Sequence, residues 1–88
     1  MDVQEAFNFG RLHLELVADA LGQLAEAETA VIIAETDYDI AQIMMDAATS
    51  TEEIMTFEDA MLRAGWQGIR AQAHVVANAR TLHDLGVK

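Results

Sequence analysis

The sequence contains no cysteine and no proline, and only 6% of its 88 residues are aromatic. Without cysteine there is no disulfide, no thiol nucleophile and no zinc-thiolate site. Without proline the strongest helix breaker is missing, so that only the five glycines interrupt the chain locally. Hydrophobic residues still make up 52% of the sequence. These features favour an ordered, helical protein over a disordered one.

Basic residues are also scarce, since five Lys and Arg stand against 15 Asp and Glu and give a net charge of −10. We therefore expect no direct binding to nucleic acid, which depends on clustered positive charge. The charge is uneven: residues 1–59 hold 14 of the acids and one base, whereas residues 60–88 hold four bases and one acid. This asymmetry suits pairing of the two ends within the chain, or head-to-tail contact between copies.

Long apolar runs are absent as well, because no segment reaches 18 consecutive apolar residues. The first five residues carry acids where a signal peptide would carry bases. We therefore expect a soluble protein without membrane insertion, cytoplasmic by default. Leaderless export and association with a virion are both compatible with such a sequence.

Two columns of small and apolar residues, each with a period of seven, run through the first half of the chain. This period is typical of a helix that packs closely along another helix. It predicts a long helix over residues 2–48, with Asp2 as N-cap and Glu5 completing a capping-box pattern. The columns are Val3, Gly10, Val17, Leu24, Val31, Tyr38, Met45 and Ala6, His13, Ala20, Ala27, Ala34, Ala41, Ala48.

A boundary follows at residues 49–51, where Ser50 or Thr51 is suited to cap a new helix that begins with two acids. The spacing predicts a second helix over residues 52–85, ended by Gly86. Its two columns are Ile54, Met61, Gly68, Val75, Leu82 and Phe57, Ala64, Ala71, Asn78, Leu85, and its stripe is broadened by Met55, Leu62, Ile69 and Val76.

Together these patterns predict an all-α helical hairpin in a single domain, residues 1–88, with alanine-rich packing like that of a coiled coil. The alternative is a three-helix up-down bundle, which would form if Gly10 or Gly22 broke the first helix. In the hairpin the arms would be roughly 70 Å and 50 Å long. The apolar start of the longer arm would then need another chain to cover it.

No pattern of residues points to catalysis, a cofactor or a metal. The sequence has no glycine-rich phosphate loop and no serine nucleophile elbow, and no acid stands three or four residues before any of its three histidines. Narrow helices that pack through alanine leave little room for a pocket that could shift the pKa of a carboxylate. We therefore expect a protein that is not an enzyme.

Gly65-Trp66-Gln67-Gly68 is the most unusual local string, and its tryptophan, the only one in the chain, is suited to anchor an interface. Trp66-Gln67-Gly68 resembles the Trp-x-Gly motif of the WXG family of small secreted helical hairpins. That family carries the motif in the turn between its helices and has an export motif after the second helix. Here the motif falls inside the second predicted helix and no Tyr-x-x-x-Asp/Glu follows, so it does not assign the chain to the family.

The sequence thus predicts a self-associating helical subunit with a structural, assembly or adaptor role, whose partner is a second copy. The alternative is a small acidic inhibitor or decoy of the kind found in phages, which blocks a nucleic-acid or nucleotide-sensing site and takes a basic protein partner. The expected interface residues combine the first seam with exposed aromatic and basic side chains of both arms. They are Phe7, Leu14, Val17, Ala20, Leu24, Ala27, Val31, Ala34, Tyr38, Ala41, Arg63, Trp66 and Arg70.

Overall fold

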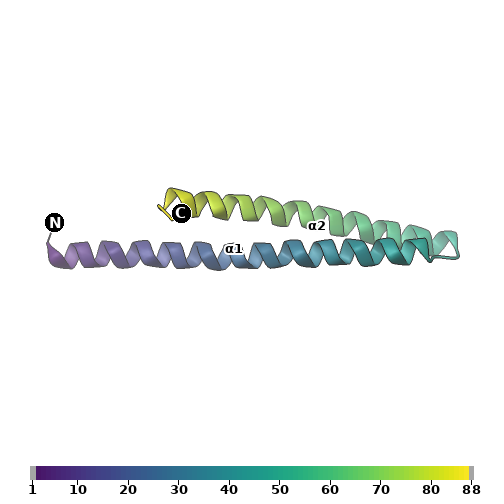
Figure 1. Ribbon diagram of the computed structural model, residues 1–88, viewed down its shortest axis with the longest axis horizontal. Coiled ribbons are helices and arrows are strands. Elements are labelled where there is room, and N and C mark those ends of the chain that lie inside the picture. The colour runs from purple at the N-terminus through teal and green to yellow at the C-terminus, as the bar shows by residue number, and fades with distance from the viewer. Residues whose placement is uncertain (1, 88) are drawn as a thin grey trace.

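The computed structural model describes residues 2–87 and shows two helices that form a hairpin (Figure 1). Helix α1 spans Val3–Asp46 and helix α2 spans Thr51–Asp84. α2 lies along the C-terminal part of α1, and the N-terminal part of α1 extends beyond it. The predicted all-α hairpin is confirmed. The ends of the predicted domain, Met1 and Lys88, lie outside the described residues.

The predicted start of α1 is confirmed, because Asp2 is its N-cap and accepts a hydrogen bond from the backbone N–H of Glu5 at 2.7 Å. The helix ends two residues earlier than predicted. Ala47 is the C-cap, and the N–H of Ala48 donates to the carbonyl of Met45 at 3.2 Å, which tightens the last turn.

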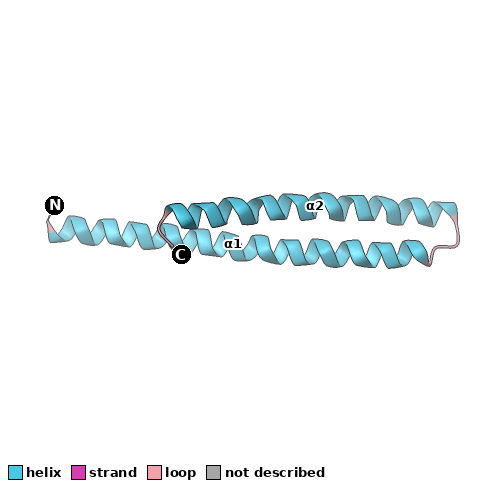
Figure 2. Cartoon of the chain, turned by 45° about the horizontal axis from the view of Figure 1, so that its top comes forward, coloured by secondary structure: helices cyan, strands magenta, loops and turns pink. Residues whose placement is uncertain are grey.

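A short connection joins the helices at one end of the molecule (Figure 2). Ser50 is the N-cap of α2, and its hydroxyl accepts from the N–H of Glu53 at 3.2 Å. The Glu53 carboxylate in turn accepts from the N–H of Thr49 at 3.2 Å. These two bonds satisfy donors on both sides of the cap, and the acids in the first turn face the positive end of the helix dipole.

The end of α2 is set by glycine, as the sequence predicts. Gly86 has a φ of +88°, in the left-handed region that favours glycine. Its N–H donates to the carbonyl of His83 and that of Val87 donates to Leu82, both at 3.0 Å. This pair of bonds is a Schellman motif, which stops the helix and satisfies two of its terminal carbonyls.

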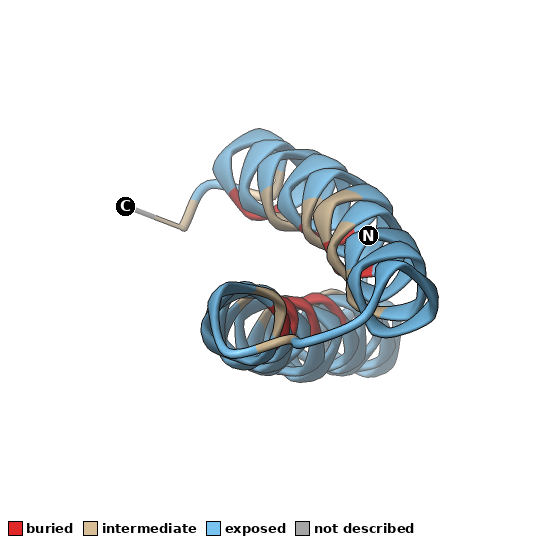
Figure 3. Ribbon diagram, turned by 90° about the vertical axis from the view of Figure 1, so that its right-hand side faces the viewer, coloured by how far each residue is buried: buried red, intermediate tan, exposed pale blue. Residues whose placement is uncertain are grey.

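The core is a thin seam between the two helices, and its buried residues lie on the sides that face each other (Figure 3). The predicted columns supply all of it: the buried residues are Ala20, Ala27, Ala34, Ala41, Ala64, Ala71 and Leu82. The other large side chains of these columns contribute only partly, since Val17, Leu24, Val31, Met61 and Val75 are half-buried. The hairpin therefore packs backbone close to backbone, through van der Waals contact along its length.

The register of the hairpin follows from the position of Gly68 opposite Ala34, because a Cβ built on Gly68 would lie 3.6 Å from the Cβ of Ala34. Since both helices rise by the same amount per residue, a residue of α2 is level with the α1 residue whose number adds to it to give about 102. Small residues then lie level with larger ones, for example Ala27 with Val75 and Ala20 with Leu82. This alternation lets the two helices approach closely.

The three-helix alternative is wrong, because α1 is continuous through both of its glycines. Gly22 is exposed, and no atom lies within 4 Å of a Cβ built on it. It therefore faces away from the seam and loses no packing. Its cost of about 1 kcal/mol in a helix interior is offset by the burial of Ala20 and Ala27 on either side.

The molecule is a rod of 72 × 17 × 15 Å, with a radius of gyration of 20.3 Å. A compact domain of this length would have a radius of gyration of about 12 Å. The register places Val87 level with Glu15, so residues 3–14 of α1 extend beyond the end of α2. We call this segment the overhang.

Candidate interaction surface

Seven of the thirteen predicted interface residues belong to the seam between α1 and α2 of the same chain. Four of them are the buried alanines of α1, and three are half-buried apolar residues of the neighbouring column. Within one copy they hold the hairpin together. Those seven residues are Val17, Ala20, Leu24, Ala27, Val31, Ala34 and Ala41.

The other six predicted residues lie at or outside the edge of the seam. Phe7 and Leu14 project from the overhang, exposed to 64% and 67%. Tyr38 lies at the seam edge and is 39% exposed. The remaining three, Arg63, Trp66 and Arg70, come together on the outside of α2, where they line one shallow hollow with Asp59, Leu62 and Gln67.

Large apolar side chains form a second stripe on α2, which the sequence pattern indicated only as a broadening of the seam stripe. We call it the outer stripe of α2. It consists of Met55, Leu62, Trp66, Ile69 and Val76, which are 57% to 73% exposed. The aliphatic members repeat every seven residues, and Trp66 lies four residues after Leu62 and three before Ile69. This spacing of four and three is the signature of a further helix-packing seam.

An apolar groove runs beside the outer stripe, between the two helices. It has a volume of about 360 Å³. α1 contributes Tyr38 and Met45, and Glu58 is the one charged residue in its lining. The remaining lining residues belong to α2 and include Gly65, Leu62 and Trp66. The absence of a side chain at Gly65 leaves the groove open beside the tryptophan.

A third apolar stripe lies on α1, outside the seam. We call it the back stripe of α1. It consists of Ile33, Ile40 and Ile43, which are 54%, 54% and 66% exposed. Around the helix, Ile33 and Ile40 lie about 100° from the buried alanine column and Ile43 about 160° from it. Ile40 also lines a hollow between the helices with Phe57 and Arg63 of α2, but more than half of each isoleucine remains exposed.

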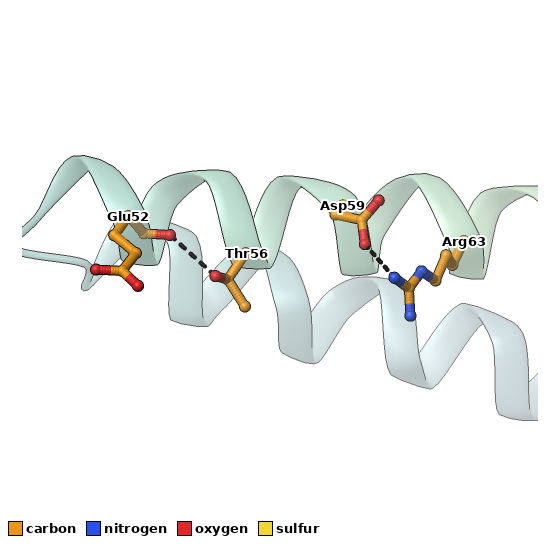
Figure 4. A network of polar contacts seen from close by, with 4 residues as sticks. All are labelled: Glu52, Thr56, Asp59 and Arg63. Carbon is orange, nitrogen blue, oxygen red and sulfur yellow. Dashed lines mark hydrogen bonds and ion pairs between the residues drawn. The ribbon is translucent and has the colours of Figure 1, made fainter.

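The charged residues do not link the two helices. Arg63 pairs with Asp59, one turn earlier on α2, at 2.6 Å (Figure 4). The same view shows Thr56 donating to the carbonyl of Glu52 at 2.9 Å, also within α2. Within residues 2–87 no ion pair joins α1 to α2. The expected pairing of the basic second arm with acids of the first is therefore not seen inside one copy.

Within residues 2–87 no three His, Asp or Glu side chains cluster closely enough to hold a metal ion. Neither helix, over that same range, is both long and apolar enough to cross a membrane. No protein-family model matches the chain, and no significant match was found among curated proteins or solved structures.

The outer and back stripes could have been found from the sequence by searching for a second heptad register. The strongest signal was the placement of Trp66 between Leu62 and Ile69. On α1 the signal was weaker, because the isoleucines alternate with polar residues such as Thr36. A search for the most strongly apolar face finds the seam first and stops there.

Proposed function

We propose that this chain is a non-enzymatic structural subunit that self-associates through its exposed apolar stripes. The observation that carries this proposal is the outer stripe of α2, an exposed row of large apolar side chains spaced for packing against a helix. In a monomer these side chains stay exposed to water and do not stabilise the fold. Packing against a helix of a second copy would bury them.

The size of the exposed surface supports the proposal. The chain exposes 6873 Å², whereas a compact monomer of its mass would expose about 5,100 Å². The excess is about 1,800 Å², close to twice the ~800 Å² that one partner contributes to a stable interface. Each copy therefore has enough uncovered surface for two interfaces.

The overhang gives independent support. It is a single helical segment of twelve residues, and isolated helices of this length are only marginally stable in water. It also exposes Phe7, Phe9, Leu12 and Leu14, each to more than half of its surface. Contact with another copy would stabilise the helix and cover these side chains together.

The test is the mass of the protein in solution, measured by sedimentation equilibrium at micromolar concentration in low and high salt. We expect a mass that is a multiple of 9.6 kDa and that persists in high salt, because apolar contact is not screened by ions. A monomer at all concentrations would contradict the proposal. It would favour instead the acidic inhibitor, whose role requires a free single copy.

A further inference from the structure

We propose that copies associate head to tail: the outer stripe of α2 in one copy packs on the back stripe of α1 in the next, with all hairpins pointing the same way. This inference rests on the proposed self-association and specifies its geometry. It follows from three features of the hairpin: the direction of the two stripes, their register, and the charges beside them.

The first feature is direction. The outer stripe lies on the side of the hairpin that carries the apolar groove, because Leu62, Trp66 and Ile69 line that groove. The back stripe lies on the opposite side, where Ile40 lines a separate hollow with Phe57 and Arg63. Each copy has one stripe of each kind, so a contact between unlike stripes leaves one of each free for further copies.

The second feature is register. The next hairpin lies alongside without an axial shift. A residue of α2 is then level with the α1 residue of the next copy whose number adds to it to give about 102, as it is within one copy. Leu62 is then level with Ile40 of the next copy, and Ile69 with Ile33. Trp66 falls level with the small Thr36. In these three layers the large residues of the outer stripe meet apolar or small residues, whereas Val76 falls level with the acidic Glu26.

The third feature is charge. Arg63 flanks the outer stripe and comes within two residues of the level of Asp37, which flanks the back stripe of the next copy on the same side. At the far end of the outer stripe, Arg80 falls between the levels of Asp19 and Glu26, which continue the column of Ile33 and Ile40 toward the N-terminus.

One unfavourable pair opposes these contacts. On the other flank, Glu58 approaches Asp46 of the next copy. This like-charge pair stands against two opposite-charge groups, so the balance of charge favours the head-to-tail arrangement. It also accounts for the basic residues of α2, which make no ion pair with α1 of their own chain within residues 2–87.

A contact between two different surfaces has a consequence that a two-fold symmetric contact lacks. It does not close after two copies but continues, either into a ring or into an open row. In either form every α2 is covered on both sides by α1 helices, one from its own chain and one from its neighbour. The assembly is a layer of antiparallel helices, and the overhangs project from one edge of it, where the stripe contact leaves them uncovered.

The experiment uses two variants of the full chain, each with one blocked stripe. Variant one carries Leu62→Glu and Ile69→Glu on α2, and variant two carries Ile33→Glu and Ile40→Glu on α1. All four side chains are more than half exposed, so the hairpin does not depend on them. The matched control is Leu21→Glu, which is 48% exposed and lies on the column of Glu28 and Glu35, away from both stripes.

We expect each variant alone to be a monomer and the control to assemble as the wild type does. An equal mixture of the two variants should double the mass, because the intact α1 of variant one meets the intact α2 of variant two and the complex can grow no further. A mixture that stays monomeric while the wild type assembles would overturn the inference, as would either variant assembling alone.

Self-association and its head-to-tail form are contradicted by different results. A monomeric wild type contradicts the proposed self-association itself, whereas the results above contradict only its head-to-tail form. Helix content is followed by circular dichroism in every sample. If a variant loses helix when alone, mixing should restore helix and mass together, and a mixture that restores neither contradicts the inference.

Discussion

Gly68 gives a direct test of the seam, because a Cβ added there, unlike one added at any other glycine, would contact the opposite helix. A Cβ added there would meet the Cβ of Ala34 at 3.6 Å, which is ordinary van der Waals contact and not a clash. Gly68→Ala should therefore stabilise the hairpin through two separate effects. The first acts on helix propensity, and the second on packing between the helices.

The two effects can be separated with Gly22→Ala as the control. Replacing glycine by alanine inside a helix stabilises by about 1 kcal/mol. At Gly22 nothing lies within 4 Å of the added carbon, so only this first effect operates. At Gly68 the added methyl is also removed from water in the seam, which contributes up to about 0.8 kcal/mol more. We expect a gain of nearly 2 kcal/mol for Gly68→Ala and of about 1 kcal/mol for Gly22→Ala.

The measurement is thermal unfolding followed by circular dichroism, with all proteins at one protomer concentration because association contributes to the midpoint. A gain of 1 kcal/mol corresponds to a rise in Tm of about 4 to 8 °C in a domain of this size. Equal shifts for the two variants would refute the described packing at Gly68. A fall in Tm for Gly68→Ala would show that the helices are already closer there than the structure has them.

Two further substitutions probe the seam and the connection, using the same unfolding assay. Ala34→Leu should destabilise the hairpin by about 1 to 3 kcal/mol, because the site is 2% exposed and a larger side chain overpacks it. The control is Ala25→Leu at an exposed site, which should change stability by less than about 0.5 kcal/mol. An unchanged Tm for Ala34→Leu would contradict the packing described for the seam. Ser50→Ala should lower the free energy of unfolding by about 1 kcal/mol, because it removes the cap of α2. Thr49→Ala should have little effect, because only the backbone N–H of Thr49 is used. Equal losses of stability would show that the hydroxyl of Ser50 is not the cap.

The fold was predictable from the sequence because its packing repeats. A column in which Ala20, Ala27, Ala34 and Ala41 recur at one position fixes both the helix and its buried side. Local chemistry then marks the ends, since the Asp2 carboxylate caps the start of α1 and the left-handed backbone of Gly86 ends α2. The end of α1 was two residues short of its prediction because Ala47 and Ala48 carry no signal that distinguishes a last helical turn from a cap.

The candidate site was only partly predictable, because exposure depends on which side of a helix its partner covers. Trp66 was expected at an interface, and its exposed position agrees with a surface role that no observation yet tests. Arg63 was also expected at an interface, and within its own chain it pairs with Asp59, one turn earlier on the same helix. The outer stripe was not predicted as a separate surface, because its residues lie beside the stronger pattern of the seam. Which side of α2 it occupies follows only from the register of the hairpin.

The thinness of the seam separates two tasks that larger cores combine. Only the inward columns, set by alanines such as Ala27 and Ala71, must keep their size for the hairpin to form. Every other position lies outside, where chemistry can change without disturbing how the arms meet. A scaffold of this kind could be given new outward-facing side chains almost freely, which makes the rod a natural frame on which to engineer altered contacts.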